Sequence, residues 1–394
     1  MSSAFDWRAD HLEWPVTTDV GPGFAGVVAA ETRVMWLDPS SGQLAYRGVS
    51  IDDIATHADF EEVAHLLITG TRATDDPEGL AGFRSQLRSS RVLPEDVIAL
   101  IRSLDPKTHP TRVLRAGVSA LGCHELSEDD DIAGSRQWRE LRVVGQVAGL
   151  VAEICRHRAG RPPRPPRENC SLTESVLFAL TDHEPEADQI RALDLLWVLY
   201  AAHGLDAPTF TSMVVASCLA DPYYNIVAGL SALRGPKSAG TAEAVLEQLL
   251  PLQDPDEARA WVRRAVDGGG AIAGFGHPSY RMPDPRVVIL RKEVATLARS
   301  CDRSNLFEVA RAVEMAATGA LAPRDIHINI NFYGALLFHL LGADPAIVPC
   351  LVAVGRMAGT AALVREALDS IRLYRPVSRY MGPAERHLNP RSES

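Results

Sequence analysis

Apolar residues recur at helical intervals along most of this chain, and that periodicity limits its fold more than any other feature. From Phe60 to Ile68 and again from His109 to Leu121, the apolar side chains fall on one helical face. Asp206 is a suitable N-cap for a further helix with Pro208 in its first turn, and we expect that helix to continue to the turn at Asp221-Pro222. Core-facing helices are therefore expected to dominate the structure.

Alternation of apolar and polar residues, the pattern typical of strands, is scarce by comparison. It occurs in three short segments, Val34 to Leu37, Leu44 to Tyr46 and His327 to Ile330. We therefore predict an all-α fold class.

The composition is that of an ordinary globular protein. The 394 residues are 46% apolar, enough to bury a sizeable core in one large or two moderate domains. The formal net charge is −10, and no run of Lys and Arg is dense enough to follow a phosphate backbone. Nucleic acid is therefore not expected as a partner, and a small anionic ligand would have to be held by local arginines.

Two segments bear on localisation. Residues Met1 to Ala25 contain no apolar core of a secretory signal, so a cytoplasmic protein is expected. The most apolar stretch, Phe332 to Val354, is interrupted by His339, Asp344 and Pro345. It therefore predicts two helices around a turn and no membrane span.

Cysteine and histidine spacing gives no sign of a metal site. No CxxC or HExxH pattern occurs, so we expect no bound metal and no disulfide framework, and a GxSxG nucleophile elbow is also absent. Reduced, buried thiols are the simplest prediction for the six cysteines, which are Cys123, Cys155, Cys170, Cys218, Cys301 and Cys350.

Two loops stand out by composition. The segment from Gly160 to Asn169 is rich in Pro and Arg, which predicts an exposed, solvated connection. The segment from Asp267 to Gly276 is glycine-rich, although its spacing matches neither a Rossmann nor a Walker loop. It indicates a place where backbone closely approaches another group.

Three arginines lie in short, punctuated contexts: Arg286 in Asp-Pro-Arg, Arg356 in Gly-Arg-Met-Ala-Gly, and Arg375 before a proline. Guanidinium groups bind carboxylates through paired hydrogen bonds, so such a set suits a di- or tricarboxylic acid. Each arginine taken alone is equally a surface or ion-pair residue. His203 and His277, taken alone, read as structural histidines.

Taken together, these segments resemble the citrate synthase family, from about Glu31 to Gly382. The matching segments occur in order along the chain: Gly42 to Gly48, Phe60 to Ala64, His109 to Gly122, His203 to Phe210, Gly235-Pro236, Gly274 to His277, Asp284 to Arg286, Asn329 to Tyr333, Arg356 to Gly359, and Arg375-Pro376. One such match would carry little weight, but the ordered series is specific.

The resemblance implies a helical homodimer in which a small domain closes over the substrates. We place the large domain at residues 1–235 with 346–394 and the small domain at 236–345. The resemblance also implies no bound cofactor and a coenzyme A thioester as co-substrate. The residues expected to bind oxaloacetate or a related polycarboxylate are His203, His277, Arg286, Arg356 and, reaching the neighbouring subunit, Arg375. Those expected at coenzyme A are Ala273, Gly274, Phe275, Gly276 and Arg281.

Two of the three catalytic positions that the resemblance implies are changed. His277 is retained, but Ser238 stands where the family has a histidine that holds the thioester carbonyl, and Asn331 stands where it has an aspartate base. Three smaller departures are Asp206 for a usual Asn, Pro278 for an Arg, and Thr360 for a Trp.

The changes remove the usual means of taking a proton from the acyl group. An amide has no basic lone pair to offer, and loss of a general base typically costs about 10²–10⁴-fold in rate. We expect Asn331 to keep a capping role at the helix that follows. Lys237 is a candidate substitute base, although its side chain could equally point away from the pocket. Glu243 and His327 are near in sequence, but no spacing places either at the thioester.

Three hypotheses follow. The first is an acyl-CoA-dependent, carbon-carbon bond-forming acyltransferase that acts on a 2-oxo dicarboxylate with a changed catalytic set. The second is a non-catalytic paralogue that binds a polycarboxylate or coenzyme A as a sensor or scaffold. The third is an ordinary citrate or methylcitrate synthase that uses a different base.

Overall fold

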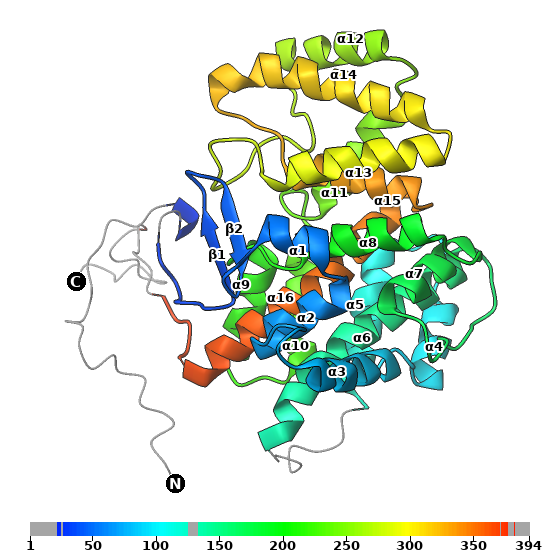
Figure 1. Ribbon diagram of the computed structural model, residues 1–394, viewed down its shortest axis with the longest axis vertical. Helices are drawn as coiled ribbons and strands as arrows, with labels where there is room; N and C mark the ends of the chain where they lie inside the picture. Colours follow the sequence, from blue (N-terminus) through cyan, green and yellow to red (C-terminus); the bar gives the residue numbers. More distant parts are fainter. Residues whose placement is uncertain (1–21, 25–26, 125–132, 371, 377–381, 383–394) are drawn as a thin grey trace, which may run out of the picture.

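The computed structural model describes residues 22–24, 27–124, 133–370, 372–376 and 382, with the backbone alone for 133–140. Sixteen α-helices and one three-stranded antiparallel sheet lie within these residues (Figure 1). The expectation of a helical fold is therefore confirmed, with a small sheet added near the start of the chain.

The sheet comprises β1 (Met35–Asp38), β2 (Gln43–Tyr46) and β3 (Val49–Ser50). The first ten helices are α1 (Ile51–His57), α2 (Phe60–Thr69), α3 (Pro77–Ser89), α4 (Glu95–Ser103), α5 (Pro110–Gly122), α6 (Ala133–Arg158), α7 (Leu172–Thr181), α8 (Ala187–Tyr200), α9 (Ala207–Ala216) and α10 (Pro222–Leu233). The others are α11 (Gly240–Leu249), α12 (Pro255–Asp267), α13 (Arg286–Ser300), α14 (Ser304–Leu321), α15 (Ile330–Leu340) and α16 (Val348–Ser370). Short 3-10 turns occupy Pro22–Phe24, Ala322–Arg324 and Pro345–Ile347.

Side-chain caps fix the start of the helices that the sequence predicted. Asp59 and Glu62 form a reciprocal capping box at α2. His109 accepts a hydrogen bond from the backbone of Thr111 at α5, and Asp206 accepts one from Thr209 at α9. Helices α2 and α5 begin where the periodicity indicated, and α9 begins at the cap predicted at Asp206.

Helix α16 runs through the larger part of the molecule and contacts α2, α5, α6, α8, α9 and α10 (Figure 1). A stretch within 345–370 has a mean hydropathy of 1.8, long and apolar enough to cross a membrane, but it is 100% buried inside the protein. A helix that is apolar on all sides belongs in such an interior position. The stretch Phe332 to Val354 divides into α15 and α16 around a 3-10 turn, as predicted.

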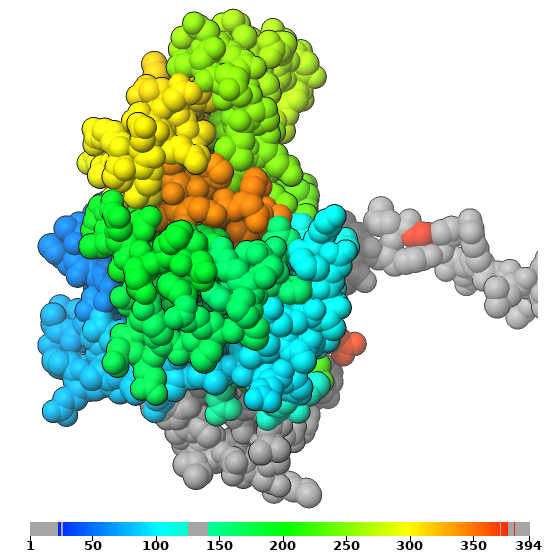
Figure 2. Space-filling model, turned by 90° about the vertical axis from the view of Figure 1, so that its right-hand side faces the viewer, coloured from blue at the N-terminus to red at the C-terminus, as the bar shows by residue number. Residues whose placement is uncertain are grey.

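The elements from α11 to α15 form a lobe at one end of the molecule (Figures 1 and 2). Within it α12 packs on α14, and α13 packs on both α14 and α15. Helices α11 and α15 also contact α16, so they join the lobe to the larger part. The lobe begins and ends close to the predicted domain boundaries at residues 236 and 345. That these residues are the limits of a domain stays a prediction.

Two sequence predictions about the limits of helices and strands were wrong. Helix α9 ends at Ala216, because Leu219 takes a left-handed φ of 62° and closes a turn onto the Ala216 carbonyl before Asp221 caps α10. The segment His327 to Ile330 is not a strand, since Ile328 forms a single bridge with Phe275. In both cases the apolar pattern covers more residues than the regular helix or strand does.

The connection between α6 and α7 has neither helix nor strand, as predicted, but its arginines are not simply solvated. Arg161 donates to the carbonyl oxygen of Ala179 over 2.9 Å, and the Arg164 guanidinium lies 4.6 Å from the ring centroid of Phe178. The loop is therefore held against α7.

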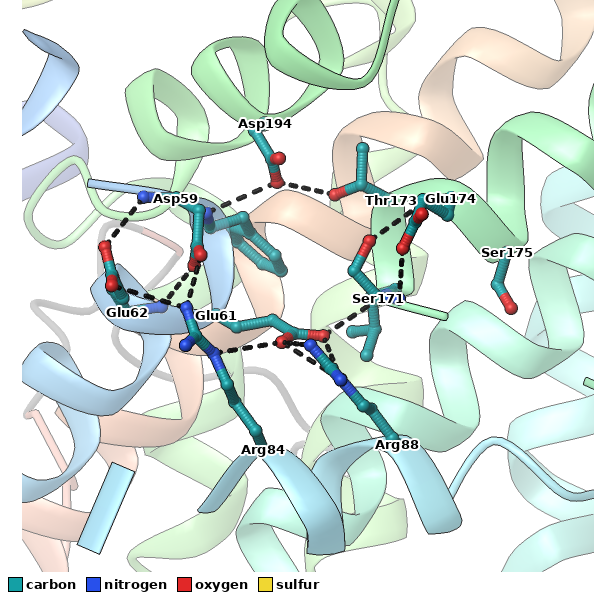
Figure 3. A network of polar contacts seen from close by, with 12 residues as sticks. Asp59, Glu61, Glu62, Arg84, Arg88, Ser171, Thr173, Glu174, Ser175 and Asp194 are labelled. Atoms are coloured by element: carbon teal, nitrogen blue, oxygen red, sulfur yellow. Dashed lines mark hydrogen bonds and ion pairs between the residues drawn. The ribbon is translucent and has the colours of Figure 1, made fainter. Parts of the chain in front are cut away.

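A polar network joins α2, α3, α7 and α8 inside the larger part (Figure 3). Glu61, 2% exposed, accepts hydrogen bonds from Arg88 and from the backbone of Leu172. Asp194 Oδ1 accepts from the Thr173 hydroxyl over 2.6 Å and from the Phe60 backbone over 3.3 Å. Burial raises the pKa of Asp194 to about 7, so this carboxyl titrates near neutrality.

Candidate active site

Two histidine rings and one tyrosine ring meet where α8 ends and where the loop before α13 begins. The rings of His203 and His277 lie edge to face with centroids 5.1 Å apart. Tyr280 lies 4.5 Å from the ring of His277, and its hydroxyl is 3.2 Å from Nε2 of His203. The structure therefore brings together two residues that are 74 positions apart in sequence, counting from 203 to 277.

Backbone hydrogen bonds fix the tautomer of His277. Its Nδ1 accepts from the backbone N–H groups of both Ser279 and Tyr280, each over 3.1 Å. A neutral ring with an accepting Nδ1 must carry its proton on Nε2. Burial lowers the pKa of His277 to about 4, with Arg286 and Arg356 acting in the same direction against Asp284. At neutral pH, His277 is therefore an uncharged hydrogen-bond donor through Nε2.

His203 is held neutral by the same surroundings. Burial holds the pKa of His203 well below its usual range, and the charges of Arg286 and Arg356 add to the effect. Because the same two arginines act on both histidines, the four side chains share one electrostatic environment.

Arg286 opens α13 and is 1% exposed. Its Nε and Nη2 donate to the two carboxylate oxygens of Asp284 over 2.9 and 2.7 Å, and its Nη1 donates to the Leu199 carbonyl over 3.1 Å. The buried charge is thus compensated by a paired contact within an Asp-Pro-Arg turn. One N–H on each terminal nitrogen is left over for a ligand.

Arg356 lies on α16 and is less completely satisfied. Its Nη1 is 3.3 Å from Oδ2 of Asp206, and this nitrogen is buried with no hydrogen-bond partner in the described part of the chain. A buried donor without a partner is costly, so Arg356 is suited to take an acceptor from a ligand.

Close packing between α16 and the segment after α8 sets this geometry. The backbone N–H of Gly359 donates to the Ala201 carbonyl over 3.1 Å, and a Cβ at 359 would lie 2.1 Å from that oxygen. Only glycine fits there. One residue on, the hydroxyl of Thr360 is 3.4 Å from that of Thr209. The two contacts hold α16 against the chain on either side of His203.

Asn331 is placed differently from expectation. Asn329 caps α15, accepting from the backbone of Asn331 over 3.0 Å, so the prediction that Asn331 caps this helix was wrong. The physical reason is that Asn331 already lies in the first turn, one residue past the helix start. Its side chain is free of that task, and its Oδ1 accepts a hydrogen bond from the Tyr200 hydroxyl.

Ser238 and Lys237 lie in the turn that precedes α11. Ser238 is half-buried and Lys237 is exposed. Within the described residues, no hydrogen bond joins the Ser238 hydroxyl to another group, and none joins it to Asn331. The structure therefore does not link these two positions directly.

The other titratable candidates have partners of their own. Glu243 lies 3.1 Å from Nε2 of His109 and 3.6 Å from Arg234. His327 pairs with Asp325 over 3.1 Å. Neither is a free base next to Asn331.

Within the described residues, no hydrogen bond or ion pair joins Arg375 to the other four predicted ligands. It is exposed on the C-terminal segment, next to Tyr374, whose ring packs on Phe210 with centroids 5.5 Å apart. The other four expected carboxylate ligands share one region of this chain.

The glycine-rich loop expected at coenzyme A packs on the start of α15. Gly274 accepts from the backbone of Asn329 over 2.8 Å, and Gly276 donates to the His327 carbonyl over 2.7 Å. A Cβ at 274, where φ is +81°, would lie 2.8 Å from Cβ of Phe332. The prediction of close backbone approach is confirmed. Arg281 lies beside this loop, 69% exposed and 3.6 Å from Asp325.

Comparison with known proteins agrees with this arrangement. The family model for the citrate synthase C-terminal domain matches residues 23–377. The chain belongs to the citrate synthase family. It is 30% identical to a citrate synthase of Deinococcus radiodurans, over 94% of this chain and 98% of that protein. It is 31% identical to a 2-methylcitrate synthase of Mycobacterium tuberculosis, over 94% of this chain and 92% of that protein.

Among solved structures, this citrate synthase family member resembles the Thermoplasma acidophilum citrate synthase in its ternary complex with carboxymethyl coenzyme A and oxaloacetate. The TM-score is 0.89 at 27% identity, covering 96% of this chain and all of that one. The protein is therefore an acyltransferase of this family by fold and sequence. Within the described residues, no three His, Cys, Asp or Glu side chains gather as a metal site would require.

Sequence reasoning missed Tyr200, Tyr280 and the role of Asp284. Asp284 could have been found, because a carboxylate two residues before an arginine at a helix start is placed to pair with it. Tyr200 and Tyr280 carry no local signal, since their partners lie far away in sequence.

Proposed function

We propose that this protein joins the acyl group of a coenzyme A thioester to the ketone carbon of a 2-oxo dicarboxylate such as oxaloacetate. The observation that carries the proposal is the state of His277. Its Nδ1 is occupied by two backbone donors, and its Nε2 is an uncharged donor beside two arginines. A ketone oxygen needs such a donor as it gains negative charge.

The acceptor would be oriented by the groups around His277. Arg356 offers to a carboxylate its Nη1, which has no hydrogen-bond partner in the described part of the chain, and Arg286 offers its remaining N–H groups. His203 would donate to the same ligand once Tyr280 shifts its hydrogen bond. In the reaction the acyl α-carbon loses a proton to a base and bonds to the ketone carbon, whose oxygen is hydrogen-bonded by His277 Nε2–H and takes up one proton, so that protons balance and His277 ends the step neutral. Hydrolysis of the thioester then releases coenzyme A.

The acyl side of the site has no carboxylate base at position 331. Asn331 keeps the size of an aspartate but turns its carbonyl oxygen toward Tyr200. Its amide nitrogen is then a donor, as is the Ser238 hydroxyl. We propose that these two groups hydrogen-bond the thioester and that proton removal falls to another group, with Lys237 the first candidate.

The coenzyme A thioester is proposed to lie along Ala273 to Gly276, with Arg281 near its phosphates. Two facts support this: the loop is fixed to the start of α15 two residues before Asn331, and Arg281 is exposed. We further propose a homodimer, supported by the exposed position of Arg375, and a cytoplasmic location, which rests on the sequence.

The decisive experiment incubates the pure protein with oxaloacetate and either acetyl-CoA or propionyl-CoA, and follows free thiol release and product mass. A condensation product supports the proposal. Ligand binding by calorimetry without any product would instead favour a sensor or scaffold. Failure of both binding and turnover would refute the proposed function.

A further inference from the structure

Asp206 lies against Nη1 of Arg356, the nitrogen proposed above to bind a carboxylate of the acceptor. Its Oδ1 is used as the cap of α9, accepting from Thr209 over 3.0 Å, which leaves Oδ2 to face Arg356 Nη1 at 3.3 Å. The two side chains are 24% and 11% exposed, so solvent screens their interaction only partly. The contact is single and long, unlike the paired contact that Asp284 makes with Arg286.

The charges of this pocket cancel. Arg286 and Arg356 contribute two positive charges, and Asp284 and Asp206 contribute two negative ones. His203 and His277 are neutral because the pKa of each is lowered. A dicarboxylate brings two further negative charges into a site that this chain alone leaves neutral. Like charges placed close together in a partly buried site disfavour binding.

We infer that Asp206 is a specificity-determining residue that sets how many carboxylates the acceptor carries. This inference rests on the proposed function and narrows its substrate class. By pairing with Arg356, Asp206 reduces the advantage of a second carboxylate, so that 2-oxo acids with a single carboxylate are accepted beside dicarboxylates. Arg286 holds the carboxylate that both kinds of acceptor share, His277 faces the ketone oxygen, and Arg356 meets the end of the acceptor that differs.

The test compares oxaloacetate with pyruvate by calorimetric titration of the full-length protein and its Asp206→Asn variant. Asparagine caps helices as well as aspartate, so α9 keeps its start. We expect Asp206→Asn to tighten oxaloacetate binding by about 10- to 100-fold, the range of a charged hydrogen bond, while pyruvate binding changes by less than about threefold. Freshly dissolved oxaloacetate avoids carry-over of its decarboxylation product.

The matched control is Asp221→Asn at the start of α10. Asp221 caps its helix in the same way, accepting from Tyr223 and Tyr224, and is not paired with Arg356. It should leave both affinities unchanged. Asp206→Ser, which also caps, serves as a second variant should Asp206→Asn fold poorly, and the same shift is expected from it.

Three outcomes are distinguishable. An oxaloacetate-to-pyruvate preference that rises in both Asp206 variants and not in the Asp221→Asn control supports the inference. An unchanged preference, with both acids still bound, overturns the role of Asp206 and leaves the proposed function standing. If no variant binds either acid, the proposed function fails and the inference fails with it.

Discussion

The phenol oxygen of Tyr200 donates a hydrogen bond to Oδ1 of Asn331 over 3.1 Å. Burial raises the pKa of Tyr200, so the phenol stays protonated and can only act as the donor toward that amide oxygen. The amide is thereby oriented, with its NH₂ group directed away from the ring. Asn331 can thus donate a hydrogen bond through its NH₂ group, whereas a carboxylate base at this position would accept a proton.

Ordinary citrate synthase activity should accordingly be very low, and Asn331→Asp alone should restore little. Ser238 still lacks an imidazole to hold the enolate, and groups that act as a unit are strongly non-additive. We expect Ser238→His with Asn331→Asp to give a gain larger than the product of the single gains. The activity of the unmodified protein, the two single variants and the double variant is measured as the steady-state release of free thiol from acetyl-CoA in the presence of oxaloacetate.

Oxaloacetate binding serves as the control in that series, since neither substitution touches His277 or the arginines. Turnover by the unmodified protein at roughly 10 per second, a common enzyme rate, would show that another base is in place. Lys237→Met would then be the first variant to test, with loss of turnover expected if this side chain is that base.

Arg286 and Arg356 should respond differently to substitution. Arg286→Ala leaves the buried carboxylate of Asp284 without its partner and should cost about 3–5 kcal/mol of unfolding free energy. Arg356→Ala leaves Asp206 partly exposed and still capping α9, so it should cost about 1 kcal/mol or less. Denaturant unfolding measures both.

Ligand-induced stabilisation separates folding from binding at the same two positions. Millimolar oxaloacetate should raise the melting temperature of the unmodified protein, because a ligand that binds the folded state stabilises it. Arg356→Ala should abolish that rise while staying folded. An undiminished rise in Arg356→Ala would remove this arginine from the ligand set.

Arg375 is expected to complete the site of a second subunit. Arg356→Ala and Arg375→Ala proteins should each fail to bind oxaloacetate. A heterodimer of the two should have one intact site of its two. That site combines Arg356 of the Arg375→Ala subunit with Arg375 of the Arg356→Ala subunit. Arg356 is preferred to Arg286 for this pairing, since it is not part of a fully buried ion pair. Absence of recovery in purified heterodimers would mean that each site is self-contained.

The sequence predicted the limits of a helix well where a local signal in the sequence coincides with the observed start or end of that helix. Helix α9 begins at the cap predicted at Asp206, and α2 and α5 begin where their apolar periodicity starts. The end of α9 could not be read, because apolar residues continue past Ala216 into a turn. The cap of α15 was ambiguous, since two asparagines lie two residues apart and both can cap.

The candidate site was predictable where residues follow a family pattern in order, and not where it depends on distant contacts. His203, His277, Arg286 and Arg356 were named in that way, and the structure places them in one electrostatic environment. Tyr200 and Asn331 are 131 residues apart in sequence, and nothing local to either indicates that they meet. Their contact arises from the packing of α8 against α15.

Asp194 offers a test that is independent of ligands (Figure 3). Burial raises the pKa of its carboxyl from 3.8 to about 7 in the folded protein, with the charge of Asp59 adding to the effect. The folded state therefore holds a proton that the unfolded chain releases at lower pH. Stability falls as pH rises from about 4 to about 7, by at most about 1.4 kcal/mol per pH unit from this group.

Asp194→Asn keeps an acceptor for Thr173 and Phe60 but cannot ionise, so its stability advantage over the unmodified protein should grow from pH 5 to pH 7 and level off above. Subtracting the unfolding free energies of the two proteins at each pH removes the contribution of every other titrating group.

Asp38→Asn is the matched control. Ser40 and Ser41 lower the pKa of Asp38 to about 2, so this carboxyl is ionised in the folded and the unfolded protein from pH 5 upward. Its difference from the unmodified protein should be flat across the same range. If the difference for Asp194→Asn were flat as well, Asp194 would be ionised inside the folded protein. Its surroundings would then have to stabilise the negative charge with a positive charge, because the hydrogen bonds from Thr173 and Phe60 supply none.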